Sequence, residues 1–406
     1  MLAYKNLKTT KKGILMQPQN ISKCIYLDNA ATTFPKAPGV KEAVSGFLEN
    51  IGASAGRSGH SLSIESGRIL YQTRKALASL VGLKDCKRVL FTLNATMAIN
   101  TLLQGFLKEK DIVVVTQMEH NAIKRPLNTL KERLNLEVRE IPCSSLHAVD
   151  LNVAKEMLKG AKLLACAHIN NVSGARIPLE DLSALAKAQN VAFLLDGAQS
   201  VGCVEMSEVM SQVDFLALSA HKGLLSPMGV GALIVTDSFA IERIEPLVFG
   251  GTGSLSEAEI QPEFLPDRFE SGTPNMHGIA GLQAGLEWIK NKGVKNIHKH
   301  ELCLREQLLS GLSGIPNIKI YYTQGQSSGT LSIDVQNHTL SKVGEILDRE
   351  FGICVRVGLH CSPSSHKSLG SFERGGTIRL SPGVFNTSAE IESTIDALRD
   401  IATRRV

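Results

Sequence analysis

The chain has 406 residues, a formal net charge of +5 and 43% hydrophobic residues. At roughly 100–200 residues per domain, this length predicts two domains or one large domain with an appendage. The composition is that of an ordinary globular protein, and it excludes a disordered chain, a fibrous repeat and a small disulfide-stabilised scaffold. The apolar runs are much shorter than the ~18 residues needed to span a bilayer, so no contact with a membrane is expected.

The eight cysteines form no Cys-x-x-Cys pair and have no regular spacing. This pattern predicts neither a zinc site nor a disulfide framework, and we expect no metal centre. Free thiols at this density fit a reducing compartment, so the expected location is the cytoplasm.

Basic residues are concentrated before Asp28, where there is no acidic residue. They are Lys5, Lys8, Lys11, Lys12 and Lys23. A nucleic-acid-binding arm is one interpretation, but a frayed basic tail over residues 1–25 is favoured. The tail has no apolar core of a secretory signal and no arginine, which argues against a targeting peptide. We therefore expect no direct binding of nucleic acid.

The middle of the chain alternates apolar, β-branched runs with helical patterns. Strands are predicted at 88–92, 112–116, 162–169, 191–196 and 215–219, and helices at 96–107 and 178–189. Such runs between helices predict a mainly parallel sheet that is covered on both faces. A further strand at 230–235 follows too closely for a crossover helix, so it is expected to be antiparallel.

The last third of the chain has a different, α+β pattern. Helices are predicted at 279–292, 297–312, 340–351 and 389–403, and strands at 318–322, 329–334, 354–357 and 377–380. The change of pattern predicts a large domain over residues 26–275 and a small C-terminal domain over residues 276–406.

Two charged residues follow neighbouring predicted strands. Asp196 ends one strand, and Lys222 comes shortly after the next. Open α/β sheets bind ligands at the carboxyl ends of their strands, so both side chains can face one crevice. A lysine there suits Schiff-base chemistry, and a carboxylate can keep the ring nitrogen of pyridoxal 5′-phosphate (PLP) protonated. Taken singly, Lys222 is better explained as a surface lysine just past the strand, and Asp196 could simply cap a helix.

A phosphate site is predicted where the strand at 88–92 meets its helix. Backbone N–H groups near Ala95 and Thr96, with the Thr96 hydroxyl, would bind a phosphate dianion. The same geometry also serves an ordinary helix cap. His120 lies just beyond the strand at 112–116, where an imidazole could stack on a planar cofactor.

A cysteine-containing segment completes the pattern. Cys361 precedes a polar segment at 362–376 that is rich in small residues and is expected to be a mobile loop. His360 or a cationic cofactor site could lower the pKa of the Cys361 thiol and favour the thiolate. Arg379 has a planar guanidinium that suits a substrate carboxylate, although an arginine on a strand more often forms a surface ion pair.

Together these motifs resemble the cysteine desulfurases, a branch of the class V aminotransferases with the fold-type I PLP architecture. The resemblance extends from about Tyr26 to the C-terminus. It rests on segments 26–33, 57–60, 119–122, 168–174, 196–199, 219–222, 269–275 and 356–361. It implies an α/β fold with a mainly parallel seven-stranded sheet in the large domain. The smaller α+β C-terminal domain would carry the catalytic cysteine loop.

The resemblance also implies roles for individual residues. Lys222 would bind PLP and move protons, Cys361 would accept sulfur, and His120 would stack on the cofactor ring. The implied cofactor ligands are Lys222, Asp196, Gln199, His120, Ala95, Thr96, Ser219, His221, Asn171 and, from a neighbouring subunit, Thr273. The implied substrate site contains Arg379, Asn171, Asn29, Ala30 and Arg356.

The implied reaction converts L-cysteine to L-alanine and leaves sulfur on Cys361 as a persulfide. The short interval from Cys361 to Arg379 is similar to that of the short-loop group, which includes selenocysteine lyases. A selenocysteine lyase is therefore the alternative, followed by another class V reaction and a non-catalytic scaffold. A homodimer and a separate sulfur-acceptor protein are the expected partners.

Overall fold

The structure is a computed structural model that describes residues 24–56, 58–144, 148–321 and 328–404. Nearly all of the predicted basic tail lies outside the described residues, as does Arg57 in the segment at 57–60. Within the described ranges, no helix is both long enough and apolar enough to cross a membrane.

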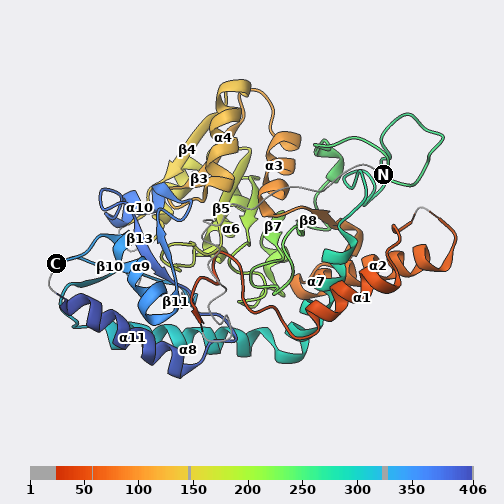
Figure 1. Cartoon of the computed structure of the whole chain (residues 1–406). Helices are drawn as coiled ribbons and strands as arrows, with labels where there is room; N and C mark the ends of the chain where they lie inside the picture. Colours follow the sequence, from red (N-terminus) through yellow and green to blue (C-terminus); the bar gives the residue numbers. More distant parts are fainter. Residues whose placement is uncertain (1–23, 57, 145–147, 322–327, 405–406) are drawn as a thin grey trace, which may run out of the picture.

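A seven-stranded sheet forms the centre of the molecule (Figure 1). Its strands are β2 (Val89–Thr92), β3 (Ile112–Thr116), β4 (Glu137–Ile141), β5 (Leu163–Ala167), β6 (Ala192–Asp196), β7 (Phe215–Ser219) and β8 (Gly231–Val235). They lie in the order β2-β8-β7-β6-β5-β3-β4. Strands β3 to β7 pair in parallel, whereas β8 is antiparallel to both of its neighbours. The predicted mainly parallel sheet and its one reversed strand are confirmed.

Helices cover both faces of this sheet because its strands are apolar on both faces. They are α1 (Val40–Asn50), α2 (Ser61–Val81), α3 (Ala95–Phe106), α4 (Asn121–Leu134), α5 (Leu151–Met157), α6 (Leu179–Ala188) and α7 (Met276–Lys292). Val113 and Val115 of β3 pack into one apolar core with α3 and α4. Val114 points the other way, into a core that contains side chains of α1, α2, α5, α6 and α7.

The C-terminal part of the chain forms a second α+β unit, drawn in teal to blue in Figure 1. Its elements are α8 (Val294–Leu312), β9 (Ile318–Tyr321), β10 (Leu331–Val335), α9 (Leu340–Phe351), β11 (Ile353–Cys354), β12 (Arg356–Gly358), α10 (Pro363–Leu369), β13 (Thr377–Leu380) and α11 (Ser388–Thr403). The antiparallel sheet β12-β13-β10-β9 shares a separate apolar core with α8, α9 and α11. The short strand β1 (Ile25–Tyr26) pairs with β11, so the start of the described chain joins this unit.

The helix at the predicted domain boundary packs with the large sheet. Ile279, Leu282 and Leu286 of α7 belong to the core that also contains α1 and α2. Leu304 and Leu308 of α8 belong to the core of the C-terminal unit. The division between residues 275 and 276 stays a prediction, and this packing favours assigning α7 to the large domain.

The first half of the segment after Cys361 is helical, so the prediction of a loop throughout 362–376 is wrong for residues 363–369. Residues Pro363–Leu369 form α10, in which Ser365 and His366 are buried. The Ser365 hydroxyl donates to the Met118 carbonyl at 2.9 Å and accepts from the Asn170 amide at 2.8 Å. Small polar residues are typical of loops, but here they satisfy buried polar groups of the large domain.

Ser365→Ala should lower the free energy of unfolding by about 1–3 kcal/mol, because two buried hydrogen bonds are lost. Urea unfolding measured by circular dichroism would give this value. The control is Ser364→Ala, at a half-buried position of the same helix. It should change the free energy by less than about 0.5 kcal/mol. Equal effects of both substitutions would contradict the docking of α10 through Ser365.

Candidate active site

The candidate cofactor residues meet at the carboxyl ends of the parallel strands, where they line a cavity of about 300 Å³. Because these strands run in one direction, their final residues and the loops that follow share one edge of the sheet. Every predicted cofactor ligand except Thr273 lines this cavity. These residues are Ala95, Thr96, His120, Asn171, Asp196, Gln199, Ser219, His221 and Lys222.

Lys222 and Asp196 form the electrostatic centre of the site. Burial lowers the pKa of the Lys222 ammonium, the Asp196 carboxylate opposes this shift, and the guanidinium groups of Arg379 and Arg356 increase it. Burial raises the pKa of Asp196, whereas an N–H bond from Ala198 and the charge of Lys222 lower it. The surroundings therefore favour a neutral lysine amine, which is the nucleophilic form.

His120 begins helix α4 and presents a neutral ring. Its Nδ1 accepts the backbone N–H of Ala122 at 3.0 Å, so the side chain caps the helix. Burial, followed by the positive charges of Lys222 and Arg356, lowers the pKa of His120 to about 4. At neutral pH the imidazole is therefore uncharged, which suits packing against a planar ring.

The predicted phosphate turn lies at the N-terminus of α3, where helix N–H groups favour an anion. Asn94 caps Met97, and the Ala95 N–H donates to Ser219 Oγ at 2.9 Å. A Cβ atom on Gly231 would lie 2.5 Å from Asn94 Cα, so β8 and this turn approach too closely for any other residue.

His221 supplies a further sign that this end of the cavity fits a polar ligand. Its Nδ1 is buried and has no hydrogen-bond partner among the described residues. Burial, with the charges of Lys222 and Lys36, lowers the pKa of His221 to about 4. A neutral imidazole with an unsatisfied nitrogen, beside hydroxyl groups and a helix N-terminus, fits the phosphate of PLP.

The N-terminal segment that contains Asn29 and Ala30 lies close to Lys222. Asn29 and Ala30 line a second, smaller cavity of about 40 Å³, together with Gln199 and Lys222. The Gln199 side-chain amide donates to the Ala30 carbonyl at 2.9 Å, which ties this segment to the cofactor cavity.

Cys361 is exposed, and its backbone is held in an unusual conformation. His360 and Cys361 have φ angles of 49° and 59°, in the left-handed region. Two hydrogen bonds hold this turn. The Asn171 amide donates to the His360 carbonyl at 2.7 Å, and the Asn121 N–H donates to the Cys361 carbonyl at 2.9 Å. Such strain persists only where surrounding contacts fix the backbone, as they do here.

Arg356, not His360, is the cation at the thiol. Arg356 Nη2 donates to Cys361 Sγ at 3.3 Å. The His360 ring is buried against Thr377, with Nε2 3.0 Å from the Thr377 hydroxyl. Burial, followed by the charge of Arg379, lowers the pKa of His360 to about 2. The prediction that His360 could favour the thiolate is wrong, because this ring stays neutral and is directed toward Thr377.

Arg379 is buried and already paired. Its Nη2 donates to Asp28 Oδ1 at 2.6 Å, and its Nη1 donates to the Asn171 carbonyl at 3.2 Å. It therefore lies beside Asn171, another residue of the predicted substrate site, and the substrate role of both stays a prediction. The residues that line the two cavities described above do not include Arg379.

Thr273 is not brought to the cofactor cavity within one chain. It is exposed and lines a separate cavity of about 420 Å³, which is also bordered by the ion pair of Arg74 and Glu270. Its predicted contribution to the site of a neighbouring subunit stays a prediction.

Glu119 is a buried acid whose importance was not recognised from the sequence. Its carboxylate accepts the Thr116 hydroxyl at 2.5 Å and the Ala167 N–H at 2.9 Å, so it joins the ends of β3 and β5. Burial raises the pKa of Glu119 to about 8. The available signal was an acidic residue close behind the β-branched run at 112–116.

Comparisons with known proteins agree with this geometry. The sequence model of the aminotransferase class-V family matches residues 25–394 of this chain. A probable cysteine desulfurase of Methanothermobacter thermautotrophicus is 33% identical over 93% of this chain and 94% of that protein. A cysteine desulfurase of Escherichia coli O157:H7 is 30% identical over 93% of both chains. The apo structure of a cysteine desulfurase from Thermococcus onnurineus NA1 has a TM-score of 0.88 and 31% identity, covering 94% of this chain and 95% of that one.

The chain therefore belongs to the class V aminotransferase family. Within that family it groups with the cysteine desulfurases, which are PLP-dependent, so the resemblance found in the sequence is confirmed.

Buried titratable groups lead to a prediction of how stability depends on pH. Burial lowers the pKa of four histidines from 6.5 to between about 2 and about 4, and raises the pKa of two glutamates from 4.5 to about 8. The groups are His120, His168, His221, His360, Glu119 and Glu301.

As the pH falls below about 6.5, the unfolded chain takes up protons on these histidines, and the folded chain does not, so stability decreases. As the pH rises toward about 8, the folded chain retains glutamate protons that the unfolded chain has already released, so stability again decreases. We expect the melting temperature to be highest near about pH 6.5, in a scan from about pH 5 to about pH 8. A steady rise from pH 6 to pH 8 would contradict these assignments.

Proposed function

We propose that this protein is a PLP-dependent cysteine desulfurase that converts L-cysteine to L-alanine and receives the sulfur on Cys361. The observation that carries this proposal is geometric: Lys222 and Asp196 line one cavity with the other predicted cofactor ligands that the chain itself supplies. One of these ligands, Asn171, also holds the turn of Cys361 through its hydrogen bond to the His360 carbonyl at 2.7 Å. An amine, an acid and a thiol are thus tied to one site, with Arg356 3.3 Å from the thiol, and these are the groups that the reaction requires.

The cavity residues would hold the cofactor in a defined orientation. Asp196 would pair with the ring nitrogen, Gln199 would donate to the phenolic oxygen, and His120 would pack on the ring. The phosphate would lie at the N-terminus of α3, against Thr96, Ser219 and His221. When bound, PLP supplies an electron sink for the negative charge that develops at the substrate Cα.

Lys222 would act on protons of the substrate. Its neutral amine can take a proton from the substrate Cα and return it where the product needs one. Burial supports this role, because it lowers the pKa of Lys222 and increases the fraction of free amine.

Cys361 would act on the sulfur atom. Its Sγ attacks the substrate sulfur, the substrate C–S bond breaks, and a new S–S bond leaves Cys361 as a persulfide. The electron pair of the broken bond stays on the substrate carbon, which is then protonated and released as alanine. Arg356 Nη2 donates to Sγ at 3.3 Å, which would hold the sulfur atom in place for the attack. The exposure of Cys361 would let an acceptor protein take the sulfur.

A homodimer would complete the cofactor site. Thr273 would contact the phosphate bound in the neighbouring subunit. Support comes from exposed apolar side chains near Thr273, since Leu93 and Val248 line the same cavity and are 57% and 48% exposed. Burial of these side chains against a second copy would remove apolar surface from water. A reducing compartment such as the cytoplasm would preserve the persulfide.

The decisive assay follows alanine formation from L-cysteine and L-selenocysteine in parallel. We expect yellow protein and alanine from L-cysteine. A colourless protein that cannot be reconstituted with PLP would refute the proposal. Turnover of L-selenocysteine alone would favour the selenocysteine lyase.

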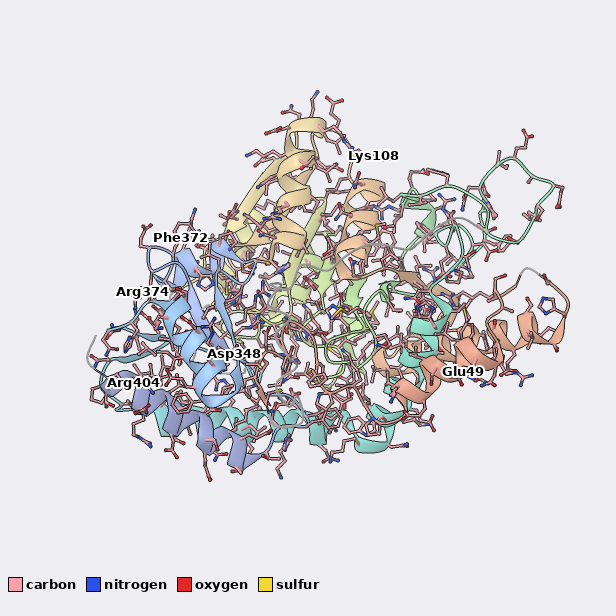
Figure 2. All side chains as sticks on the ribbon, viewed as in Figure 1. Glu49, Lys108, Asp348, Phe372, Arg374 and Arg404 are labelled. Carbon is pink, nitrogen blue, oxygen red and sulfur yellow. The ribbon has the colours of Figure 1, made fainter. Side chains whose placement is uncertain are left out.

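Lys222→Ala should abolish alanine formation and covalent retention of PLP, because the amine that binds the cofactor is removed. Absorption spectra after gel filtration, together with alanine assays, test this. The control is Lys108→Ala. Lys108, labelled in Figure 2, is exposed and precedes β3, so it lies at the amino end of that strand, whereas the site lies at the carboxyl ends. Unchanged turnover in Lys222→Ala would rule out its assigned role.

Cys361→Ala should retain PLP but lose more than about 100-fold of the cysteine desulfurase rate, because the nucleophile is missing. Cys303→Ala removes another exposed thiol, on α8, and should have the wild-type rate. Normal desulfuration in Cys361→Ala would refute this nucleophile. Retained turnover of L-selenocysteine in the same variant would favour the lyase.

A further inference from the structure

The guanidinium of Arg379 is paired with a carboxylate of the protein itself. The Arg379 side chain is 1% exposed, and Asp28 Oδ1 lies 2.6 Å from its Nη2. A buried guanidinium without a counter-ion is costly, so Asp28 meets a physical need of the free protein. An incoming substrate carboxylate would require the same guanidinium.

Arg379 retains one unused donor. Its Nη1 and Nη2 have partners, but its Nε is buried and has none among the described residues. A guanidinium binds a carboxylate best through two parallel N–H groups, and Asp28 contacts it through Nη2. The pairing is therefore incomplete, and a donor remains for a carboxylate that adopts a two-point geometry.

The groups around Arg379 carry an excess of positive charge that one more anion would neutralise. Arg356 and Cys361 act on Arg379, and Lys222 lies in the same electrostatic environment with Asp196. Two guanidinium groups, those of Arg379 and Arg356, thus face one carboxylate, that of Asp28. One further carboxylate would balance this set, and an amino-acid substrate carries one.

Asp28 can release Arg379 without moving the backbone. Its side chain is 21% exposed, so the carboxylate has access to water that Arg379 lacks. The backbone of Asp28 is held next to the end of β13. Asp28 and Ser381 form an isolated parallel β-bridge, and the Ser381 N–H donates to the Leu27 carbonyl at 2.8 Å. Because the backbone is held there, release of the guanidinium would come from a rotation of the Asp28 side chain.

We propose that Asp28 is the resident counter-ion of Arg379 and that the substrate carboxylate displaces it, so that Asp28 sets the affinity for the amino-acid substrate. This inference rests on the proposed function, because it takes Arg379 as the site for the substrate carboxylate. Asp28 neutralises the charge of Arg379 in the free site and lowers the affinity for any carboxylate that competes with it. It is a positioning residue that controls substrate binding rather than the chemical step.

The test measures carboxylate binding by the full-length protein with PLP bound. Melting temperatures are recorded against concentration for L-alanine and for L-alaninamide, which lacks the carboxylate. In Asp28→Asn the half-maximal L-alanine concentration should fall about tenfold, within the usual range of coupling between two ligands. The same variant should melt at a lower temperature without ligand, because Arg379 loses its counter-ion. L-Alaninamide should show no such gain.

Two further variants serve as controls. Asp28→Glu keeps the charge and should keep an affinity within about threefold of the wild type, since the competing carboxylate remains. Asp334→Asn breaks another ion pair, with Arg374 at 2.9 Å, and should leave L-alanine binding unchanged. Arg374 lies at the outer side of the C-terminal unit (Figure 2). If Asp28→Asn does not fold, Asp28→Ser replaces it with the same expectation.

Weaker binding of L-alanine by Asp28→Asn would overturn the proposal, because Asp28 would then orient Arg379 for the substrate instead of competing with it. Unchanged binding would overturn it too. Steady-state kinetics with L-cysteine provide a second measurement, with a lower KM and a nearly unchanged kcat expected. A wild-type protein that makes no alanine from L-cysteine would refute the proposed function, while the L-alanine binding data would still decide the role of Asp28.

Discussion

The burial of an amine at the carboxyl ends of the parallel strands is the constraint on which the rest of this site depends. Removing the charge of Lys222 from water costs several kcal/mol, so the surrounding groups decide which form of the amine exists. Asp196 favours the ammonium, and Arg356 and Arg379 favour the free amine. The neutral rings of His120 and His221 follow from the same burial, which makes further positive charge near Lys222 unfavourable.

The C-terminal unit is fixed to the large sheet by polar contacts rather than by an apolar interface alone. Asn170 and Asn171, just after β5, bind Ser365, Ser362 and the His360 carbonyl. Each of these groups is buried, and each would be costly to leave without a partner. The position of Cys361 relative to Lys222 therefore depends on directional hydrogen bonds, which tolerate less displacement than apolar packing does.

Much of the architecture could be predicted because it follows from apolar patterns. The bounds predicted for β3, β7, α9 and β13 are those of the structure. Strand β4 was missed because its sequence carries charged residues at an edge of the sheet, and edge strands have a weak apolar pattern. Helix α10 was missed because its serines are read as loop residues, although they make buried hydrogen bonds.

The sequence predicted which residues form the site better than it predicted the directions of their side chains. Motifs identified the residues that line the cavity, but no motif could state that His360 is directed away from Cys361. That direction follows from left-handed φ angles and from Thr377, a residue 17 positions away. The pairing of Arg379 with Asp28 likewise joins residues 351 positions apart, which no local pattern can reveal.

The pairing of β1 with β11 affects how the protein is made. During synthesis, residues 25–28 leave the ribosome early, but the strands that they join lie beyond residue 350. The large sheet can form while the chain is still growing, since its seven strands end at Val235. The active site at the carboxyl ends of its strands stays incomplete until the C-terminal strands have been synthesised. Complete synthesis therefore comes before a complete active site, so a ribosome that stops early releases a chain without the assembled catalytic site.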